Sequence, residues 1–248
     1  MRTILIAGLG LIGGSAGMAL RRRGWRVRYL DPFVSLDDAV AAGAADERVE
    51  TFDGDSDLIL LAAPVDVAVE QLRTIDTFAT SACSVMHPLR AVGKTSFVAG
   101  HPLAGSHEHG LKAAEPRLFE GRPWFVDGDD ERVDAMIADC GGTRERVESA
   151  EEHDAALALT SHLPQVMSTA LAAYLAEQGE DVLRYGGAGL RTFLRLAASS
   201  AEVWEPVIEA NRDHLERHAD GVAELMRRIV AGDSAELFRN AQQLWKKQ

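Results

Sequence analysis

A glycine-rich turn near the start of the chain constrains the fold more than any other stretch. The apolar run Ile4–Ala7 reads as a strand buried on both faces, and Gly8–Gly13 follows it with the spacing G-x-G-x-x-G. A helical segment then ends in Arg21–Gly24, and a second strand, Arg26–Leu30, runs into Asp31. In this context the motif predicts a turn that lets the backbone approach a pyrophosphate, and a helix whose amino terminus attracts phosphate charge.

The same region predicts the cofactor. Asp31 would accept hydrogen bonds from the adenine ribose and repel a 2′-phosphate, which favours NAD over NADP. A further buried strand, Asp57–Ala63, ends in small residues that would let the nicotinamide half of NAD pass. The alternative is an unliganded glycine turn with a solvated Asp31. The predicted cofactor-binding residues are Gly8, Leu9, Gly10, Leu11, Ile12, Gly13, Asp31, Ala62, Ala63 and Pro64.

Residues 1–149 alternate between strands and helices. Strand-like runs cover residues 79–86, 97–99, 124–126 and 143–147, and helices are expected at residues 65–73 and 131–139. This alternation predicts a Rossmann-type, doubly wound α/β domain. The run Phe97–Ala99 leads into Gly100-His101-Pro102, which places His101 at a strand tip, where open α/β sheets bind their ligands.

Residues 150–248 read as an all-α domain. Apolar residues recur at helical spacing from residue 159 to 174, and Pro164 should kink or locally open that helix. Further helices are expected at residues 190–197, 203–215, 220–230 and 234–246. The apolar positions exceed what a small bundle can bury, so we expect a homodimer that forms through this domain.

Composition narrows the partners and the compartment. The net charge of −12 and the pI near 5.1 argue against nucleic acid and anionic membranes. Two cysteines, a start without a signal-peptide pattern and no apolar run of about 20 residues favour the cytoplasm. The histidine groups His101/His107/His109 and His214/His218 lack further ligands at fitting spacings, so no metal is expected.

Several motifs together resemble the prephenate/arogenate dehydrogenases. They are the glycine loop, Gly100–Ser106 (GHPLAGS), Glu152–Asp154 (EHD) and Ser161–Pro164 (SHLP), in the family's order along nearly the whole chain. The resemblance implies a nucleotide-binding domain followed by a helical dimerisation domain. It also implies an enzyme of tyrosine biosynthesis that oxidatively decarboxylates a small cyclohexadienyl substrate, with hydride passing from ring C4 to NAD.

The resemblance also implies residue roles. His101 matches the family's catalytic base and Ser84 the serine that orients the substrate's C4 hydroxyl, while Arg195 matches the arginine that binds a substrate carboxylate. Each also has a structural interpretation: an ordinary strand end for His101 and Ser84, and an ion pair for Arg195. The predicted catalytic residues are His101 and Ser84, and the predicted substrate-binding residues are Arg195, Gln165, Trp204, Arg191 and His162.

Departures from the family pattern bear on the substrate. Ser81 and Met86 stand where many members have an acid and a base, and Thr192 follows Arg191 where an Asp is common. Gln165 replaces a second histidine that is associated with the substrate side chain. A neutral amide tolerates an ammonium better than a histidine does, so we favour arogenate over prephenate. Nothing follows Gln248, so no appended regulatory domain is expected.

Two rival functions remain open at this stage. One is a dehydrogenase for 4-amino-4-deoxyprephenate, in which His101 would face an amine. The other is a non-catalytic NAD-binding sensor, suggested by the missing acid and base around Ser84, although His101, Ser84 and Arg195 together argue against it.

Overall fold

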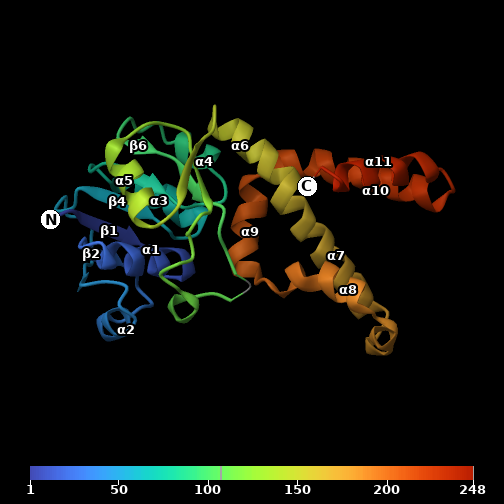
Figure 1. The fold of residues 1–248 in the computed structure, drawn as a ribbon, viewed down its shortest axis with the longest axis horizontal. Coiled ribbons are helices and arrows are strands. Elements are labelled where there is room, and N and C mark those ends of the chain that lie inside the picture. Colours follow the sequence, from blue (N-terminus) through green and yellow to red (C-terminus); the bar gives the residue numbers. More distant parts are fainter. Residues whose placement is uncertain (107, 248) are drawn as a thin grey trace.

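The computed structural model describes residues 1–106 and 108–247. His107, one of the histidines considered above for a metal, lies outside the described residues. Figure 1 shows an α/β part, coloured blue to green, beside a helical part, coloured yellow to red, as the change in sequence pattern near residue 150 predicts.

A six-stranded parallel sheet forms the centre of the α/β part, in the order β3-β2-β1-β4-β5-β6. Its strands are β1 (Thr3–Ala7), β2 (Arg26–Leu30), β3 (Glu47–Arg48), β4 (Leu58–Leu61), β5 (Ala79–Ser81) and β6 (Phe97–Val98). The central strands β1 and β4 are almost entirely buried, because helices cover both faces of the sheet.

The helices pack against the sheet in two apolar cores, one on each face. On one face α1 (Leu11–Arg22) and α5 (Glu131–Asp139) pack on Ile4 and Ile6, and on the other α3 (Val65–Thr74) and α4 (His87–Arg90) pack on Leu5 and Ala7. A short helix, α2 (Leu36–Ala41), follows β2. The predicted doubly wound fold is therefore confirmed.

The approach to His101 differs from the expected single strand. The chain leaves the parallel sheet after β6 and enters a second, three-stranded sheet of β7 (Gly100–Pro102), β8 (Pro123–Val126) and β9 (Thr143–Arg146). His101 therefore lies inside β7, opposite Phe125 of the antiparallel strand β8, and not at the tip of a parallel strand. Gly100 permits this change of sheet, because a Cβ there would lie 2.7 Å from the Ser81 carbonyl oxygen.

Ser84 also lies outside a strand. The expected strand over residues 79–86 stops at Ser81, and Ser84 sits three residues later in an irregular segment before α4. The Ser81 hydroxyl marks the end of this strand. It lies 3.0 Å from both the amide nitrogen and the carbonyl oxygen of Gly100, and so ties β5 to β7.

The helical part contains a local change of helix type. Its elements are α6 (Ala150–Leu157), a π turn (Ala158–His162), α7 (Leu163–Glu177), a 3₁₀ turn (Glu180–Tyr185), α8 (Ala188–Phe193), a 3₁₀ turn (Leu194–Ala198), α9 (Ala201–Ala210), α10 (Arg212–Val230) and α11 (Ala235–Trp245). The opening expected near Pro164 is present as the π turn, which ends two residues before the proline. The Leu163 amide bonds back five residues to Ala158 there.

The boundary between α9 and α10 corrects a sequence prediction. A helix expected over residues 203–215 ends at Ala210, and α10 begins at Arg212 and continues to Val230. The buried side chain of Asn211 fills the corner, since its Nδ2 donates to the Asp154 carbonyl at 2.8 Å and to His162 Nδ1 at 3.0 Å.

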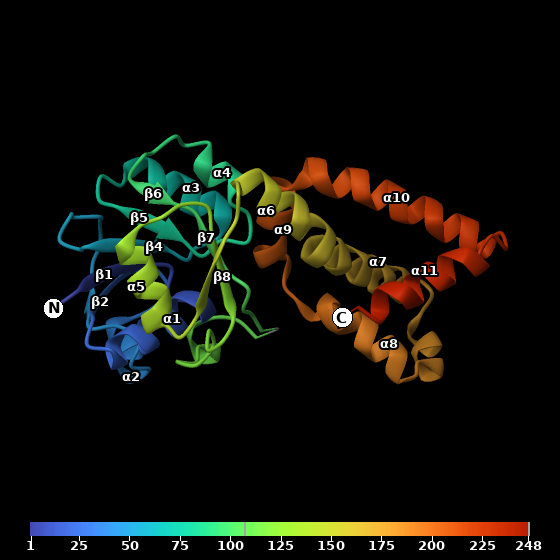
Figure 2. The same cartoon turned by 45° about the horizontal axis from the view of Figure 1, so that its top comes forward.

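The end of the helical part lies far from the sheet. Figure 2 shows α10 and α11 as a pair that extends away from the α/β part, and of its residues only Leu215 is buried. Within the described residues, no helix combines the length and the apolar character that crossing a membrane requires.

Candidate active site

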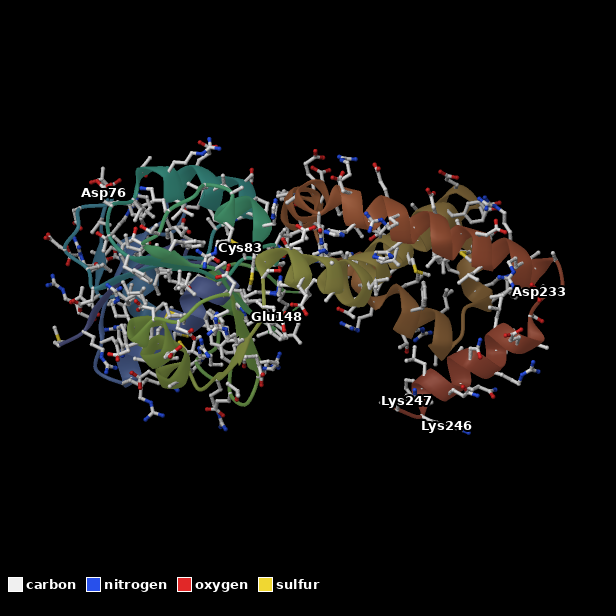
Figure 3. All side chains as sticks on the ribbon, turned by 90° about the horizontal axis from the view of Figure 1, so that it is seen from above. Asp76, Cys83, Glu148, Asp233, Lys246 and Lys247 are labelled. Atoms are coloured by element: carbon white, nitrogen blue, oxygen red, sulfur yellow. The ribbon has the colours of Figure 1, made fainter. Side chains whose placement is uncertain are left out.

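A cavity of about 300 Å³ opens where the α/β part meets the helical part. Figure 3 shows Cys83, which lines it, on the side of the α/β part that faces the helices. Eight of the predicted site residues, seven from the α/β part and one from α9, line this cavity. The predicted residues in its lining are Gly10, Leu11, Ile12, Ala62, Ala63, Pro64, Ser84 and Trp204.

The glycine loop fits a dinucleotide. Gly8 has φ 94°, and a Cβ there would lie 2.7 Å from the Ala63 amide nitrogen. A Cβ on Gly13 would lie 2.0 Å from the Gly8 carbonyl oxygen, whereas a Cβ on Gly10 would meet nothing within 4 Å. No side chain caps α1 at Gly10. The loop is therefore tight against the protein on one side and open on the cavity side, as a pyrophosphate cradle at a helix amino terminus requires.

Asp31 lies against this loop. Its Oδ2 accepts a hydrogen bond from the Leu9 amide at 2.7 Å, and its Oδ1 accepts from the amides of Phe33 and Val34 at 2.8 and 3.2 Å. Oδ2 retains capacity for another donor, whereas Oδ1 already accepts two hydrogen bonds. The proposed contact with the adenine ribose therefore stays a prediction, made by a carboxylate that is already held in place.

His101 is buried beside a second histidine. Only 7% of His101 is exposed, and its Nδ1 lies 3.0 Å from Nε2 of His153 on α6. Burial, reinforced by His153 and His162, lowers the pKa of His101 to about 3. The imidazole is therefore neutral at physiological pH and able to accept a proton. His101 is not among the residues that line the cavity.

His153 and Asp154 form part of this site, although the sequence analysis assigned them no role. The Asp154 carboxylate is buried, and its Oδ1 lies 2.8 Å from His153 Nδ1. Its oxygens also accept hydrogen bonds from the amides of Met86 and His87. The sequence signal was the pair His-Asp at residues 153–154, but its partner His101 lies 52 residues away, in another part of the fold.

His162 is fully buried and its protonation is defined by Asn211. Because Asn211 Nδ2 also donates to a carbonyl oxygen, it acts as the donor to His162 Nδ1, so a neutral His162 carries its proton on Nε2. Burial is the main cause that lowers the pKa of His162 to about 4. Its ring packs edge-to-face on Trp204 at 5.9 Å between centroids. The Nε2–H of His162 is thus a hydrogen-bond donor on a ring that packs against Trp204, which lines the cavity.

Gln165 is buried one helical turn beyond His162. Its Nε2 donates to the Leu196 carbonyl oxygen at 2.9 Å and to Thr169 Oγ1 at 3.1 Å. A carbonyl oxygen accepts only from the NH₂ end of an amide, which fixes the orientation of the side chain. Within the described part of the chain, Gln165 Oε1 has no hydrogen-bond donor.

Arg191 and Arg195 lie apart from these groups. Both are exposed, on α8 and on the 3₁₀ turn that follows it, and neither lines the cavity. Arg195 does precede Leu196, whose carbonyl holds Gln165. The structure thus brings together the predicted loop residues, Ser84 and Trp204, and it leaves the two arginines at the surface.

The departures at Ser81 and Met86 have structural roles. Ser81 links β5 to β7 as described above, and the Met86 side chain is fully buried in the core beside α3 and α4. Neutral residues suit these two positions because both are buried. Of the two histidines His214 and His218, considered above for a metal, His214 has a side-chain partner: its Nε2 lies 3.1 Å from a carboxylate oxygen of Glu151.

Comparisons with known proteins agree with this arrangement. Residues 16–140 match the family model "Prephenate dehydrogenase, nucleotide-binding domain", and residues 149–243 match "Prephenate dehydrogenase, dimerization domain". Prephenate dehydrogenase of Bacillus subtilis is 31% identical over 96% of this chain and 72% of its own length.

Two solved structures extend the comparison. Prephenate dehydrogenase from Aquifex aeolicus, in complex with hydroxyphenyl propionate and NAD+, is 26% identical with a TM-score of 0.85, covering 100% of this chain and 97% of that one. Arogenate dehydrogenase from Synechocystis is 25% identical with a TM-score of 0.76, covering 99% and 98%. The chain therefore belongs to the prephenate dehydrogenase family, and it is an NAD-dependent oxidoreductase that oxidatively decarboxylates prephenate or arogenate.

Proposed function

We propose that the substrate of this enzyme is arogenate, the member of the substrate pair that carries an amino acid side chain. The observation that carries the proposal is the orientation of Gln165. Its NH₂ group is occupied by Leu196 and Thr169, so its free buried atom is the acceptor Oε1. Arogenate bears an ammonium where prephenate bears a keto oxygen. An ammonium can donate to Oε1, and a keto oxygen would face another acceptor.

His162 complements this acceptor. Its Nε2–H is a donor without a partner among the described residues, one helical turn before Gln165. A donor and an acceptor side by side match the carboxylate and the ammonium of an amino acid, whereas a keto acid presents acceptors only. Arg195, next to Leu196, is the proposed second partner of a substrate carboxylate, for which its planar bidentate group is suited.

The mechanism follows from the neutral imidazole. When bound, NAD accepts the hydride that leaves ring C4. His101 takes the proton of the C4 hydroxyl as this happens, and Ser84 orients that hydroxyl from the cavity wall. CO₂ leaves C1 and the ring becomes aromatic. The loop residues Gly8–Gly13 would hold the pyrophosphate, Asp31 the adenine ribose, and Ala62–Pro64 the side next to the nicotinamide.

We also propose how the chain is divided into domains. The boundary between a nucleotide-binding domain, 1–149, and a substrate and dimerisation domain, 150–248, lies just before α6. The exposed apolar residues of α10 and α11 support a homodimer formed through the second domain; they are Leu225, Met226, Ile229, Val230, Phe238, Leu244 and Trp245. Both cysteines are buried free thiols, which supports a reducing, cytoplasmic location.

The test is a spectrophotometric NADH assay with arogenate, prephenate and 4-amino-4-deoxyprephenate offered in parallel. We expect arogenate to give the highest kcat/KM. A mismatched buried polar group costs about 1–3 kcal/mol, so the preference over prephenate should be about 5- to 150-fold. Gln165→His should reduce this ratio, and Gln178→His, on the exposed end of the same helix, should leave it unchanged. A higher kcat/KM with prephenate would refute the proposal, and no reduction with any substrate would favour the sensor function.

A further inference from the structure

The strongest unexplained feature of the site is a chain of three buried side chains that crosses between the two parts of the molecule. It starts at Asp154, passes through His153 and ends at His101. Asp154 and His153 belong to α6, and His101 belongs to β7. The exposed fractions are 1% for Asp154, 3% for His153 and 7% for His101. Three polar side chains so deeply buried need a reason for being there.

The carboxylate end of the chain accepts hydrogen bonds only. Asp154 receives two backbone amides from the segment before α4, Met86 N at 2.9 Å and His87 N at 2.7 Å. These donors stabilise the ionised carboxylate and fix its position. The atom of His153 that faces it, Nδ1 at 2.8 Å, must therefore carry a proton.

The state of His153 then determines that of His101. A neutral histidine with its proton on Nδ1 has a lone pair on Nε2. That lone pair faces His101 Nδ1 at 3.0 Å, and the two rings stand at 90° to one another. A hydrogen bond forms only if His101 donates from Nδ1. The remaining nitrogen of His101, Nε2, is then left unprotonated.

We propose that His153 and Asp154 are positioning residues that hold His101 in the tautomer with a proton on Nδ1, so that Nε2 is the proton acceptor in catalysis. The inference rests on the role of His101 in the proposed function. In the reaction the substrate O–H bond breaks and an N–H bond forms at His101 Nε2. The resulting imidazolium donates more strongly from Nδ1 to His153, whose own proton is held by the Asp154 carboxylate.

One other protonation state of His153 fits the same distances. A cationic His153 would carry protons on both nitrogens and donate to His101 Nδ1, which would place the proton of a neutral His101 on Nε2. That tautomer has no lone pair for the substrate hydroxyl. Besides His153, His162 is the titratable group that acts on His101, and the Asp154 carboxylate contacts His153. Phe125 packs against His153 from β8 at 5.7 Å between ring centroids.

The decisive experiment combines ¹⁵N NMR of the histidine side chains in the full-length enzyme with steady-state kinetics of Asp154→Asn. The ¹⁵N shifts of wild-type His101, assigned by comparison with His101→Asn, should show a protonated Nδ1 and an unprotonated Nε2. In Asp154→Asn the amide oxygen can still accept from the backbone, and its NH₂ group would face His153 Nδ1. This reverses the tautomer of His153 and hence that of His101.

We expect kcat of Asp154→Asn to fall by about 10²- to 10⁴-fold with KM nearly unchanged, because the amide leaves the histidine in the wrong tautomer. Glu152→Gln, a neighbouring exposed acid on α6, should keep kcat within about twofold of wild type and serves as the matched control. NADH binding by fluorescence should be unchanged in both variants.

Two results would overturn the inference. One is a wild-type His101 with its proton on Nε2, a measurement that does not depend on any variant folding. The other is Asp154→Asn with wild-type kcat. If His101→Asn is inactive in that case, the base assignment stands and only the positioning role fails. If His101→Asn keeps its turnover, the proposed function of His101 itself is wrong.

Discussion

Two glycines of the cofactor loop should respond to the same substitution in opposite ways. A Cβ on Gly10 would meet no protein atom within 4 Å, and its φ of −80° lies outside the left-handed region that favours glycine. Gly10→Ala should therefore change the free energy of unfolding by no more than about 1 kcal/mol. The new methyl group would occupy the open side of the loop, where the pyrophosphate is expected.

The cost for cofactor binding can be derived from the hydrogen bonds that the methyl group blocks. A bond from a backbone amide to a charged phosphate contributes about 1.5–3 kcal/mol, so losing one weakens binding by about 10- to 150-fold. Gly13→Ala gives the contrast. Its Cβ would lie 2.0 Å from the Gly8 carbonyl oxygen, and the backbone must move. Such overpacking costs about 1–3 kcal/mol of stability.

The assay pairs a fluorescence titration with NADH and thermal unfolding of the enzyme without nucleotide. Gly10→Ala should keep its Tm and lose affinity, whereas Gly13→Ala should unfold several degrees lower, since 1 kcal/mol shifts Tm by about 2–4 °C at this chain length. Wild-type affinity in Gly10→Ala would show that the open side of the loop is not the pyrophosphate site. Equal losses of Tm in both variants would contradict the difference in packing between Gly10 and Gly13.

Three further predictions concern His101, His162 and Asp31. His101→Asn should bind NADH normally and lose turnover by about 10²- to 10⁴-fold, and near-normal turnover would rule out its role as base. Because burial lowers the pKa of His101 to about 3 and of His162 to about 4, the unfolded chain binds protons that the folded protein does not as pH falls below about 6.5. Stability in urea should therefore decline from pH 6.5 to 4 by about 1.4 kcal/mol per pH unit for each histidine, and a flat profile would contradict their neutrality. NAD+ should give a higher kcat/KM than NADP+ because of Asp31, and the reverse order would exclude that carboxylate as the selector.

The fold was predictable where the determinants are local. The glycine spacing, the apolar run Ile4–Ala7 and the following helix are readable from neighbouring residues, and the structure contains them as β1, the loop and α1. The end of β6 could not be predicted from neighbouring residues. The change to a second sheet depends on the contact between Gly100 and Ser81, which lies 19 residues earlier in another strand.

In the candidate site, too, local features could be predicted from the sequence and long-range contacts could not. Ser84 and Trp204, both named from sequence motifs, line the cavity, and His101 is buried with a lowered pKa, while the roles proposed for these residues stay predictions. The contacts that define its chemistry are long-range. His153 reaches His101 across 52 residues, so its role could not follow from periodicity or spacing. The corner at Asn211 was missed for a similar reason, since its side chain bonds to Asp154 and His162 on earlier helices.

The π turn at Ala158–His162 determines which way the predicted substrate-binding residues His162 and Gln165 point relative to His153 and Asp154. A π turn contains one more residue per turn than an α-helix, and each residue of a helix advances the side-chain direction by about 100°. His153 and Asp154 lie before the turn, and His162 and Gln165 lie at its end and beyond it. Refolding this turn as regular α-helix with the same number of residues would rotate Gln165 by about 100° relative to Asp154, because the π turn absorbs the advance of its extra residue. Deleting that extra residue would instead leave the two directions nearly unchanged. The π turn thus sets the angular phase between His153 and Asp154, proposed to position the base, and Gln165, proposed to select the substrate.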